Sequence, residues 1–88
     1  QICKVQVAGE IGADTVLIQA RNGSTMRLTA LDVVPGHETA MGQRFIDRYA
    51  RGGAAIGKFR SRDVALRRAH ALCRKLTQAA GAQSMAVR

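Results

Sequence analysis

The stretch TVLIQARNGSTMRLTALDVV, residues 15–34, decides the fold. At its centre lies Asn22-Gly23, which is typical of a type I′ turn because both central positions of that turn need a positive φ angle. The segments on either side, 15–21 and 24–34, are rich in β-branched and other apolar residues. In the second segment polar residues alternate with an apolar set that shares one face: Met26, Leu28 and Ala30. The stretch therefore predicts an antiparallel β-hairpin.

The N-terminal segment QICKVQVA, residues 1–8, shows the same alternation. Cys3, Val5 and Val7 fall on one face of the predicted strand. We expect this strand to precede the hairpin in a three-stranded antiparallel meander. Pro35-Gly36 then ends the sheet, because proline cannot donate a hydrogen bond to a strand ladder.

The next segment, HETAMGQRFIDRYARGG, residues 37–53, fits a helix or a strand over 38–51. On a helix three apolar side chains share one face at a spacing of four, with Ile46 beside them: Met41, Phe45 and Tyr49. Asp47 would then pair with Arg51 at i+4, and Gly52-Gly53 would end the helix. A strand would place the Asp47 carboxylate among the aromatic side chains, so the helix is favoured.

The C-terminal third contains AAIGKF, residues 54–59, which predicts a short fourth strand, and then a long helix. Ser61 is a suitable N-cap, Asp63 suits the first turn, and Gly81 would end the helix after about Ala80. We therefore expect an α+β fold with the C-terminal basic amphipathic helix packed on the sheet. Residues 1–80 would form one compact domain, and residues 81–88 a flexible tail.

Projection of this last helix at 100° per residue separates two opposite arcs. The apolar arc would pack on the sheet and contains Ala65, Ala69, Leu72, Cys73, Leu76 and Ala80, with Leu66 at its edge. The basic arc would face solvent and contains Arg67, Arg68, Arg74 and Lys75. Like charges on one helix face repel one another, which suggests that this face meets a negatively charged partner.

Charge is distributed unevenly along the chain. The formal net charge is +8, with −1 in residues 1–40 and +9 in residues 41–88. Such asymmetry is typical of proteins that bind nucleic acid. We predict phosphate contacts from the helix and the segment before it, and from a second basic stripe on the preceding helix. The predicted contact residues are Lys58, Arg60, Arg62, Arg67, Arg68, Arg74 and Lys75, together with Arg44, Arg48 and Arg51. Arg62 lies on the apolar side of the projection, so it could instead extend past the edge of the core.

The junction GKFRSRDVALRRA, residues 57–69, resembles the strand, F-x-[ST] element and alanine-spaced helix of the arm-type DNA-binding domains of phage integrases. The resemblance implies DNA binding by a sheet-plus-helix module. Those domains place a three-stranded sheet immediately before the helix, whereas here a predicted helix intervenes.

Other functions find less support in the sequence. Gly52, Gly57 and Lys58 match GxxxxGK, but Phe59 replaces the Ser or Thr of a P-loop, so a glycine turn before a short strand is expected. No spacing of His and Cys demands a metal site, and no nucleophile–base pair suggests an enzyme. We expect no cofactor. The strands predicted within residues 1–34 lack aromatic residues, which argues against base stacking, and residues 52–60 are too long for a helix-turn-helix turn.

Duplex DNA or structured RNA is therefore the predicted partner, and an acidic protein surface is the main alternative. Membrane attachment is disfavoured because the apolar arc is alanine-rich and is needed by the core. Cys3 and Cys73 are expected to be reduced, partly buried thiols. The N-terminus lacks the apolar segment of a signal peptide and no apolar run is long enough to span a bilayer, so a cytoplasmic location is expected.

Overall fold

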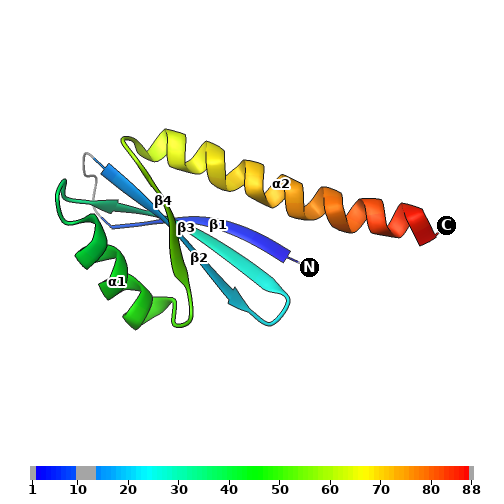
Figure 1. Ribbon diagram of the computed structural model, residues 1–88, viewed down its shortest axis with the longest axis horizontal. Coiled ribbons are helices and arrows are strands. Elements are labelled where there is room, and N and C mark those ends of the chain that lie inside the picture. Colours follow the sequence, from blue (N-terminus) through cyan, green and yellow to red (C-terminus); the bar gives the residue numbers. More distant parts are fainter. Residues whose placement is uncertain (1, 10–13, 88) are drawn as a thin grey trace.

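A computed structural model describes the backbone of residues 2–9 and 14–87 and the side chains of residues 2–9 and 14–76. Four strands and two helices follow one another as β1 (Ile2–Ala8), β2 (Asp14–Asn22), β3 (Thr25–Val33), α1 (Glu38–Tyr49), β4 (Ala54–Phe59) and α2 (Arg62–Val87). Figure 1 shows the two helices packed on a single four-stranded sheet. The predicted α+β class is confirmed.

The β2–β3 hairpin forms as the sequence predicts. The two strands pair antiparallel from Asp14 opposite Val33 to Asn22 opposite Thr25. Gly23 takes a φ of 64° in the turn, a conformation that glycine adopts without a steric penalty. The order of the sheet, however, is β1-β3-β2-β4, with β1 parallel to β3. The predicted antiparallel meander is therefore wrong in its first strand.

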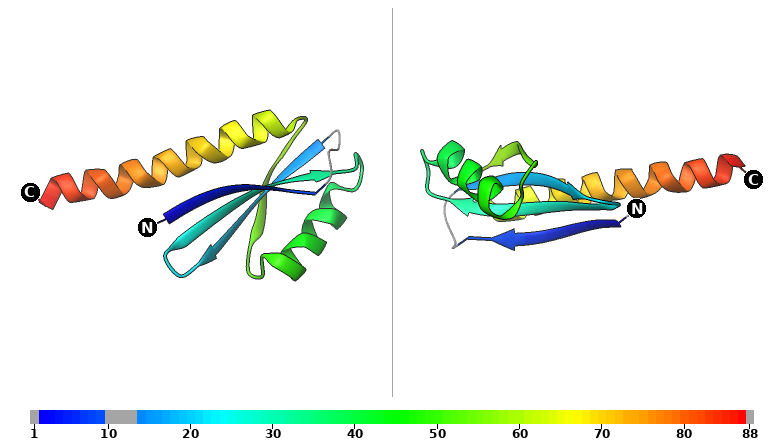
Figure 2. Two further views of the ribbon diagram at one scale, coloured as in Figure 1. Left: turned by 180° about the vertical axis from the view of Figure 1, so that it is seen from behind. Right: turned by 90° about the horizontal axis from the view of Figure 1, so that it is seen from below.

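The position of β1 has a physical reason. Strand β4 pairs antiparallel with β2 and occupies its second edge, so the outer edge of β3 is the one left for β1. The parallel register sets Cys3 beside Met26 and Val5 beside Leu28, which extends one apolar face of the sheet. Strand β1 consequently forms an edge of the sheet, as the right-hand view of Figure 2 shows.

The sheet buries both of its faces. Because side chains alternate along a strand, Val16 and Ile18 of β2 pack with α1, whereas Leu17 packs in the cluster beneath α2. The core under α1 also contains Leu31, Val33, Ile46 and Ala50. The core under α2 also contains Met26, Leu28 and Ala69, with Cys3, Val5, Phe59, Leu72, Cys73 and Leu76 at its margin. The two helices thus cover opposite faces.

The helix predicted over 38–51 is confirmed, but the face that it buries differs from the predicted stripe. The side of α1 against the sheet is Gly42, Ile46 and Ala50. A Cβ atom at Gly42 would lie 3.7 Å from a methyl carbon of Val16, so α1 approaches β2 closely here. Met41 and Phe45 pack only at the margin of this core, and Tyr49 lies outside it.

The predicted ion pair between Asp47 and Arg51 does not form. The Arg51 Nε donates a hydrogen bond of 3.4 Å to the backbone carbonyl oxygen of Asp47. The Asp47 carboxylate instead accepts a hydrogen bond of 2.8 Å from the Gln43 side chain, one helical turn earlier.

Helix α2 begins as predicted and ends later than predicted. The Ser61 hydroxyl accepts a hydrogen bond of 3.2 Å from the backbone N–H of Val64, which makes Ser61 the N-cap. Ala65 and Ala69 are fully buried, and their small side chains allow the helix to lie close to the sheet. The helix passes through Gly81, the predicted end, and continues to Val87 beyond the end of the sheet (Figure 1). Arg88 lies outside the described residues, and the predicted flexibility of residues 81–88 stays a prediction.

Cys3 and Cys73 form a disulfide, with their Cα atoms 5.6 Å apart. The expectation of two reduced thiols is therefore wrong for this structure. The physical reason is the position of β1, which carries Cys3 under α2 next to Cys73. The bond covalently joins the edge strand β1 to the long helix.

Candidate nucleic-acid interface

The outward face of α2 carries four exposed cationic side chains, which we call the α2 basic face: Arg67, Arg68, Arg74 and Lys75. They lie opposite Ala65 and Ala69, the positions buried against the sheet. Among the described side chains no carboxylate forms an ion pair with any of the four. Arg67 and Arg74 are two turns apart, or about 10 Å along the helix axis. The predicted basic arc is thus exposed as expected.

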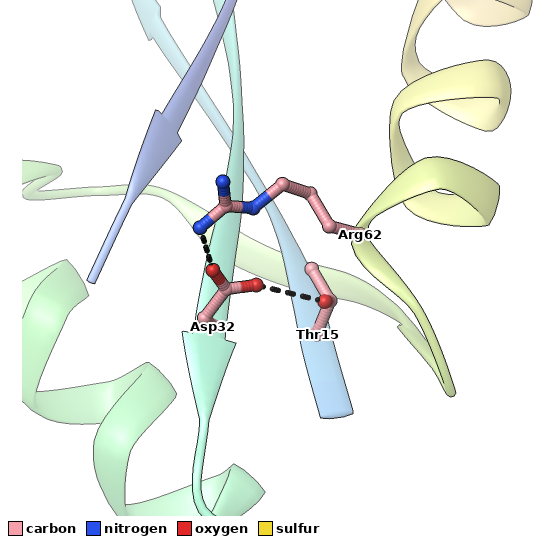
Figure 3. A network of polar contacts seen from close by, with 3 residues as sticks. All are labelled: Thr15, Asp32 and Arg62. Carbon is pink, nitrogen blue, oxygen red and sulfur yellow. Dashed lines mark hydrogen bonds and ion pairs between the residues drawn. The ribbon is translucent and has the colours of Figure 1, made fainter. Parts of the chain in front are cut away.

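Arg62 does not belong to this face. It reaches from the first turn of α2 to the carboxylate of Asp32 on β3 and forms an ion pair with it (Figure 3). Asp32 is only 3% exposed, and it also accepts a hydrogen bond of 3.0 Å from the Thr15 hydroxyl. The hydrogen bond from Arg62 to Asp32 raises the pKa of the Arg62 guanidinium. Arg62 is the counter-ion of a buried carboxylate, so its role in the fold is a stabilising one.

Lys58, in β4, and Arg60, just after it, are both exposed and lie outside α2. Lys58 is opposite Val16 in the sheet, and this register places it on the side covered by α1. It lies near Glu38, and its charge contributes to lowering the pKa of the Glu38 carboxyl; the larger cause is the hydrogen bond from the backbone N–H of Gly36. Arg60 lies in the connection between β4 and α2.

The arginines predicted on α1 lie on the opposite side of the sheet from the α2 basic face. Arg44 and Arg48 line a hollow of about 690 Å³ between α1 and the β1–β3 edge. Arg27 of β3 and the ring of Tyr49 line the same hollow. Tyr49 is 66% exposed although it is a large aromatic residue. The ten predicted contact residues therefore do not form one site.

Arg27 and Tyr49 are candidate contact residues that the sequence pattern does not single out. The apolar stripe predicted for the helix includes Tyr49 and would bury it. A signal is nevertheless present, because the alternative stripe of Gly42, Ile46 and Ala50 has the same spacing and leaves Tyr49 outside. Arg27 alternates with Met26 and Leu28, so the pattern that buries those two exposes it on the opposite face.

The GxxxxGK segment, residues 52–58, forms a turn followed by the antiparallel edge strand β4. The Phe59 ring lies over Gly57, where an added Cβ would be 2.9 Å from it. The expected glycine turn and short strand are thus confirmed, and the segment has no phosphate-binding loop.

Metal and membrane sites find no support in the described part of the chain. Within residues 2–9 and 14–76, no three His, Cys, Asp or Glu side chains gather as a metal site would require. In the part of the chain that the structure describes, neither helix has the length and apolar character needed to cross a membrane.

Comparison with known proteins gives no match, since no family model, curated protein or solved structure resembles this chain significantly.

Proposed function

We propose that this protein is a non-enzymatic nucleic-acid-binding protein that contacts phosphates through the α2 basic face. One observation carries the proposal. Four cations share an exposed helix surface, and no described carboxylate pairs with them. A helix that pairs its charges internally needs no partner, whereas this one retains a concentrated positive potential.

The geometry of the face supports contact with a polyanion. The pairs Arg67–Arg68 and Arg74–Lys75 are separated by about 10 Å along the helix axis. A DNA duplex presents one negative charge per roughly 1.7 Å of its axis, so each pair would meet phosphates at the same time. Such contacts position a protein on the backbone and read little sequence. Duplex DNA and structured RNA both present a suitable backbone.

An anisotropy titration with a labelled 20-base-pair duplex at low ionic strength tests the proposal. We expect a Kd in the micromolar range or below for the unchanged protein. The test variant changes the whole α2 basic face to glutamine: Arg67→Gln, Arg68→Gln, Arg74→Gln and Lys75→Gln. The matched control removes the same charge from the other side of the sheet: Arg27→Gln, Arg44→Gln, Arg48→Gln and Arg51→Gln.

The α2 variant should lose at least about ten-fold more duplex affinity than the control variant. Absence of binding by the unchanged protein at low ionic strength, or equal losses in the two variants, would overturn the proposal. Thermal melting of each variant checks that the fold is retained.

A partner protein with an acidic surface is the second candidate, and one observation favours the binding of a protein chain. Strand β4 is an edge strand whose Ala54, Ala55 and Ile56 are exposed, which is a surface that a partner chain could extend by strand addition. A pull-down after nuclease treatment would favour this candidate if it recovers one acidic protein in stoichiometric amount and the duplex titration is negative.

The cytoplasmic location is likewise a proposal. A reducing cytoplasm would keep Cys3 and Cys73 as free thiols, whereas the disulfide that they form in this structure is favoured in an oxidising compartment. Alkylation of thiols in freshly lysed cells decides between the two, because only reduced cysteines are labelled.

A further inference from the structure

The exposed ring of Tyr49 lies at the centre of a second arginine-rich surface. The hollow between α1 and the β1–β3 edge adjoins another of about 240 Å³ near the β2–β3 turn, and Tyr49 and Arg27 line both. Four exposed arginines border the two hollows around this ring on the α1 side of the sheet, and we call the set the Tyr49 surface: Arg27, Arg44, Arg48, Arg51 and Tyr49. No described carboxylate lines either hollow.

The side chains around Tyr49 hold its ring in place at the surface. The Phe45 ring packs against it with the two centroids 5.2 Å apart. The Arg48 guanidinium carbon lies over the Tyr49 ring, 5.8 Å from its centre, which is within cation–π distance. An exposed aromatic ring that is already restrained by neighbouring side chains loses little conformational freedom when a second ring stacks on it.

The combination of residue types indicates the ligand. Arginines around hollows that no described carboxylate lines favour a polyanion, and phosphates supply that charge. An exposed aromatic ring among them adds a stacking position, which the flat rings of unpaired bases fill and which a duplex, with its bases already stacked, cannot. A bare phosphate chain would satisfy the arginines and leave the ring exposed. An acidic peptide would do the same.

We infer that the Tyr49 surface binds a single-stranded segment of nucleic acid, with a base stacked on Tyr49 and phosphates held by the surrounding arginines. This goes beyond the proposed function, because it concerns the opposite side of the sheet and a different form of nucleic acid. The hypotheses for the Tyr49 surface and for the α2 basic face can therefore be confirmed or refuted independently.

The intrinsic fluorescence of Tyr49 provides the probe for testing this inference. Tyr49 is the only tyrosine, and there is no tryptophan, so the intrinsic fluorescence reports on this ring alone. We expect the strands dT15 and U15 to quench this fluorescence in a saturable way, after correction for absorption by the oligonucleotide. A 15-site abasic strand should not quench it, since it carries phosphates without bases. Tighter binding of dT15 or of U15 identifies the natural strand as DNA or RNA, and either result supports the inference.

Anisotropy with labelled dT15 measures the contribution of the ring. Tyr49→Leu should weaken binding roughly ten-fold or more, whereas Tyr49→Phe should retain most of the affinity because it keeps the stacking face. The quenching experiment on the unchanged protein needs no variant, so the inference stays testable even if a variant folds poorly.

Several results would overturn the inference. They are the absence of quenching by both strands, equal dT15 affinity for Tyr49→Leu and the unchanged protein, and complete displacement of dT15 by polyglutamate at equal charge concentration. The last result would assign the surface to an acidic protein. The α2 variant that loses duplex binding should still show quenching by dT15. Quenching without duplex binding would therefore refute the proposed function alone, and duplex binding without quenching would refute this inference alone.

Discussion

At the scale of single residues, the contact between Arg62 and Asp32 shows how a basic residue in a basic segment can serve the core. A carboxylate on β3 is almost fully buried, and burial of a charge is costly unless a counter-ion and hydrogen bonds compensate it. Arg62 and Thr15 supply these (Figure 3). The ion pair also attaches the first turn of α2 to the sheet.

Arg62→Met should therefore destabilise the protein, because it leaves the Asp32 charge buried without its counter-ion. We expect the melting temperature to fall by at least about 5 °C. Arg60→Met is the matched control, since Arg60 is exposed and has no carboxylate partner among the described side chains. Equal melting temperatures of the two variants would contradict this role of Arg62.

Two glycines should respond in opposite directions to alanine. At Gly42 an added methyl group would make only an ordinary contact with Val16, so the gain in helix propensity should raise the free energy of unfolding by about 1 kcal/mol. At Gly53 the added methyl group would lie 2.6 Å from the carbonyl oxygen of Gln19. Gly53→Ala should therefore lower the free energy of unfolding by roughly 1–3 kcal/mol. Urea denaturation of the two variants measures both values, and a shift of the same sign in both would disprove the packing described around one of them.

At the scale of elements, the N-terminus of α1 is held by a carboxylate. The backbone N–H of Gly36 donates a hydrogen bond of 2.8 Å to Glu38, which lies in the first helical turn. This hydrogen bond is the main cause that lowers the pKa of Glu38 below its ordinary value of 4.5. Because the folded pKa is the lower one, the stabilisation is present above about pH 4.5 and is lost as the pH falls through the folded value.

Glu38→Gln should consequently lower the melting temperature at pH 7 and have little effect once the carboxyl group is protonated in both states. Thermal melts of the variant and the unchanged protein from pH 7 down to pH 2.5 measure the difference. A difference that does not change with pH would show that the Glu38 charge has no part in holding this helix end.

The disulfide couples two other elements, β1 and α2. The cysteines are 70 positions apart, so the bond restricts a long loop in the unfolded chain. Chain-entropy arguments give about 4 kcal/mol of stabilisation for a loop of this size. Reduction with dithiothreitol should lower the free energy of unfolding by this order, measured with urea. The variant Cys3→Ser/Cys73→Ser should match the reduced protein and should not respond to dithiothreitol, and equal stability of the oxidised and reduced forms would contradict the effect.

The elements themselves are predictable from the sequence, and their arrangement is predictable only in part. Alternation and Asn22-Gly23 identify the hairpin, and Ser61 identifies the start of α2, because these signals are local. The neighbour of β1 is not predictable, since alternation specifies which face a residue takes and not which strand lies beside it. The disulfide is not predictable for the same reason, because it depends on the position of β1 beside β3.

The candidate site is less predictable than the fold. The α2 basic face follows from helical periodicity alone and is exposed as expected. The roles of Arg62 and Tyr49 differ from those predicted because they depend on contacts with other elements. Arg62 forms an ion pair with the buried Asp32 instead of facing solvent. The buried stripe of α1 is displaced by one residue from the predicted stripe that contains Tyr49. A helical pattern with two possible apolar stripes cannot by itself decide which one packs on the sheet.

At the scale of the whole molecule, the sheet separates two basic surfaces of different character. The α2 basic face consists of charged side chains on a helix 26 residues long. The Tyr49 surface adds an exposed aromatic ring to its arginines and lies on the side covered by α1. One molecule could thus hold a duplex on one side and an unpaired strand on the other.

The salt dependence of duplex binding tests the central claim most directly. Each phosphate that a cationic side chain neutralises contributes about 0.9 to the steepness of log K against log salt concentration. We predict that the variant with all four residues of the α2 basic face changed to glutamine has a slope shallower by roughly 3 than that of the unchanged protein. The control variant at Arg27, Arg44, Arg48 and Arg51 should keep a slope within about 1 of that of the unchanged protein. Equal slopes for the unchanged protein and the α2 variant would show that this helix face does not contact the phosphates.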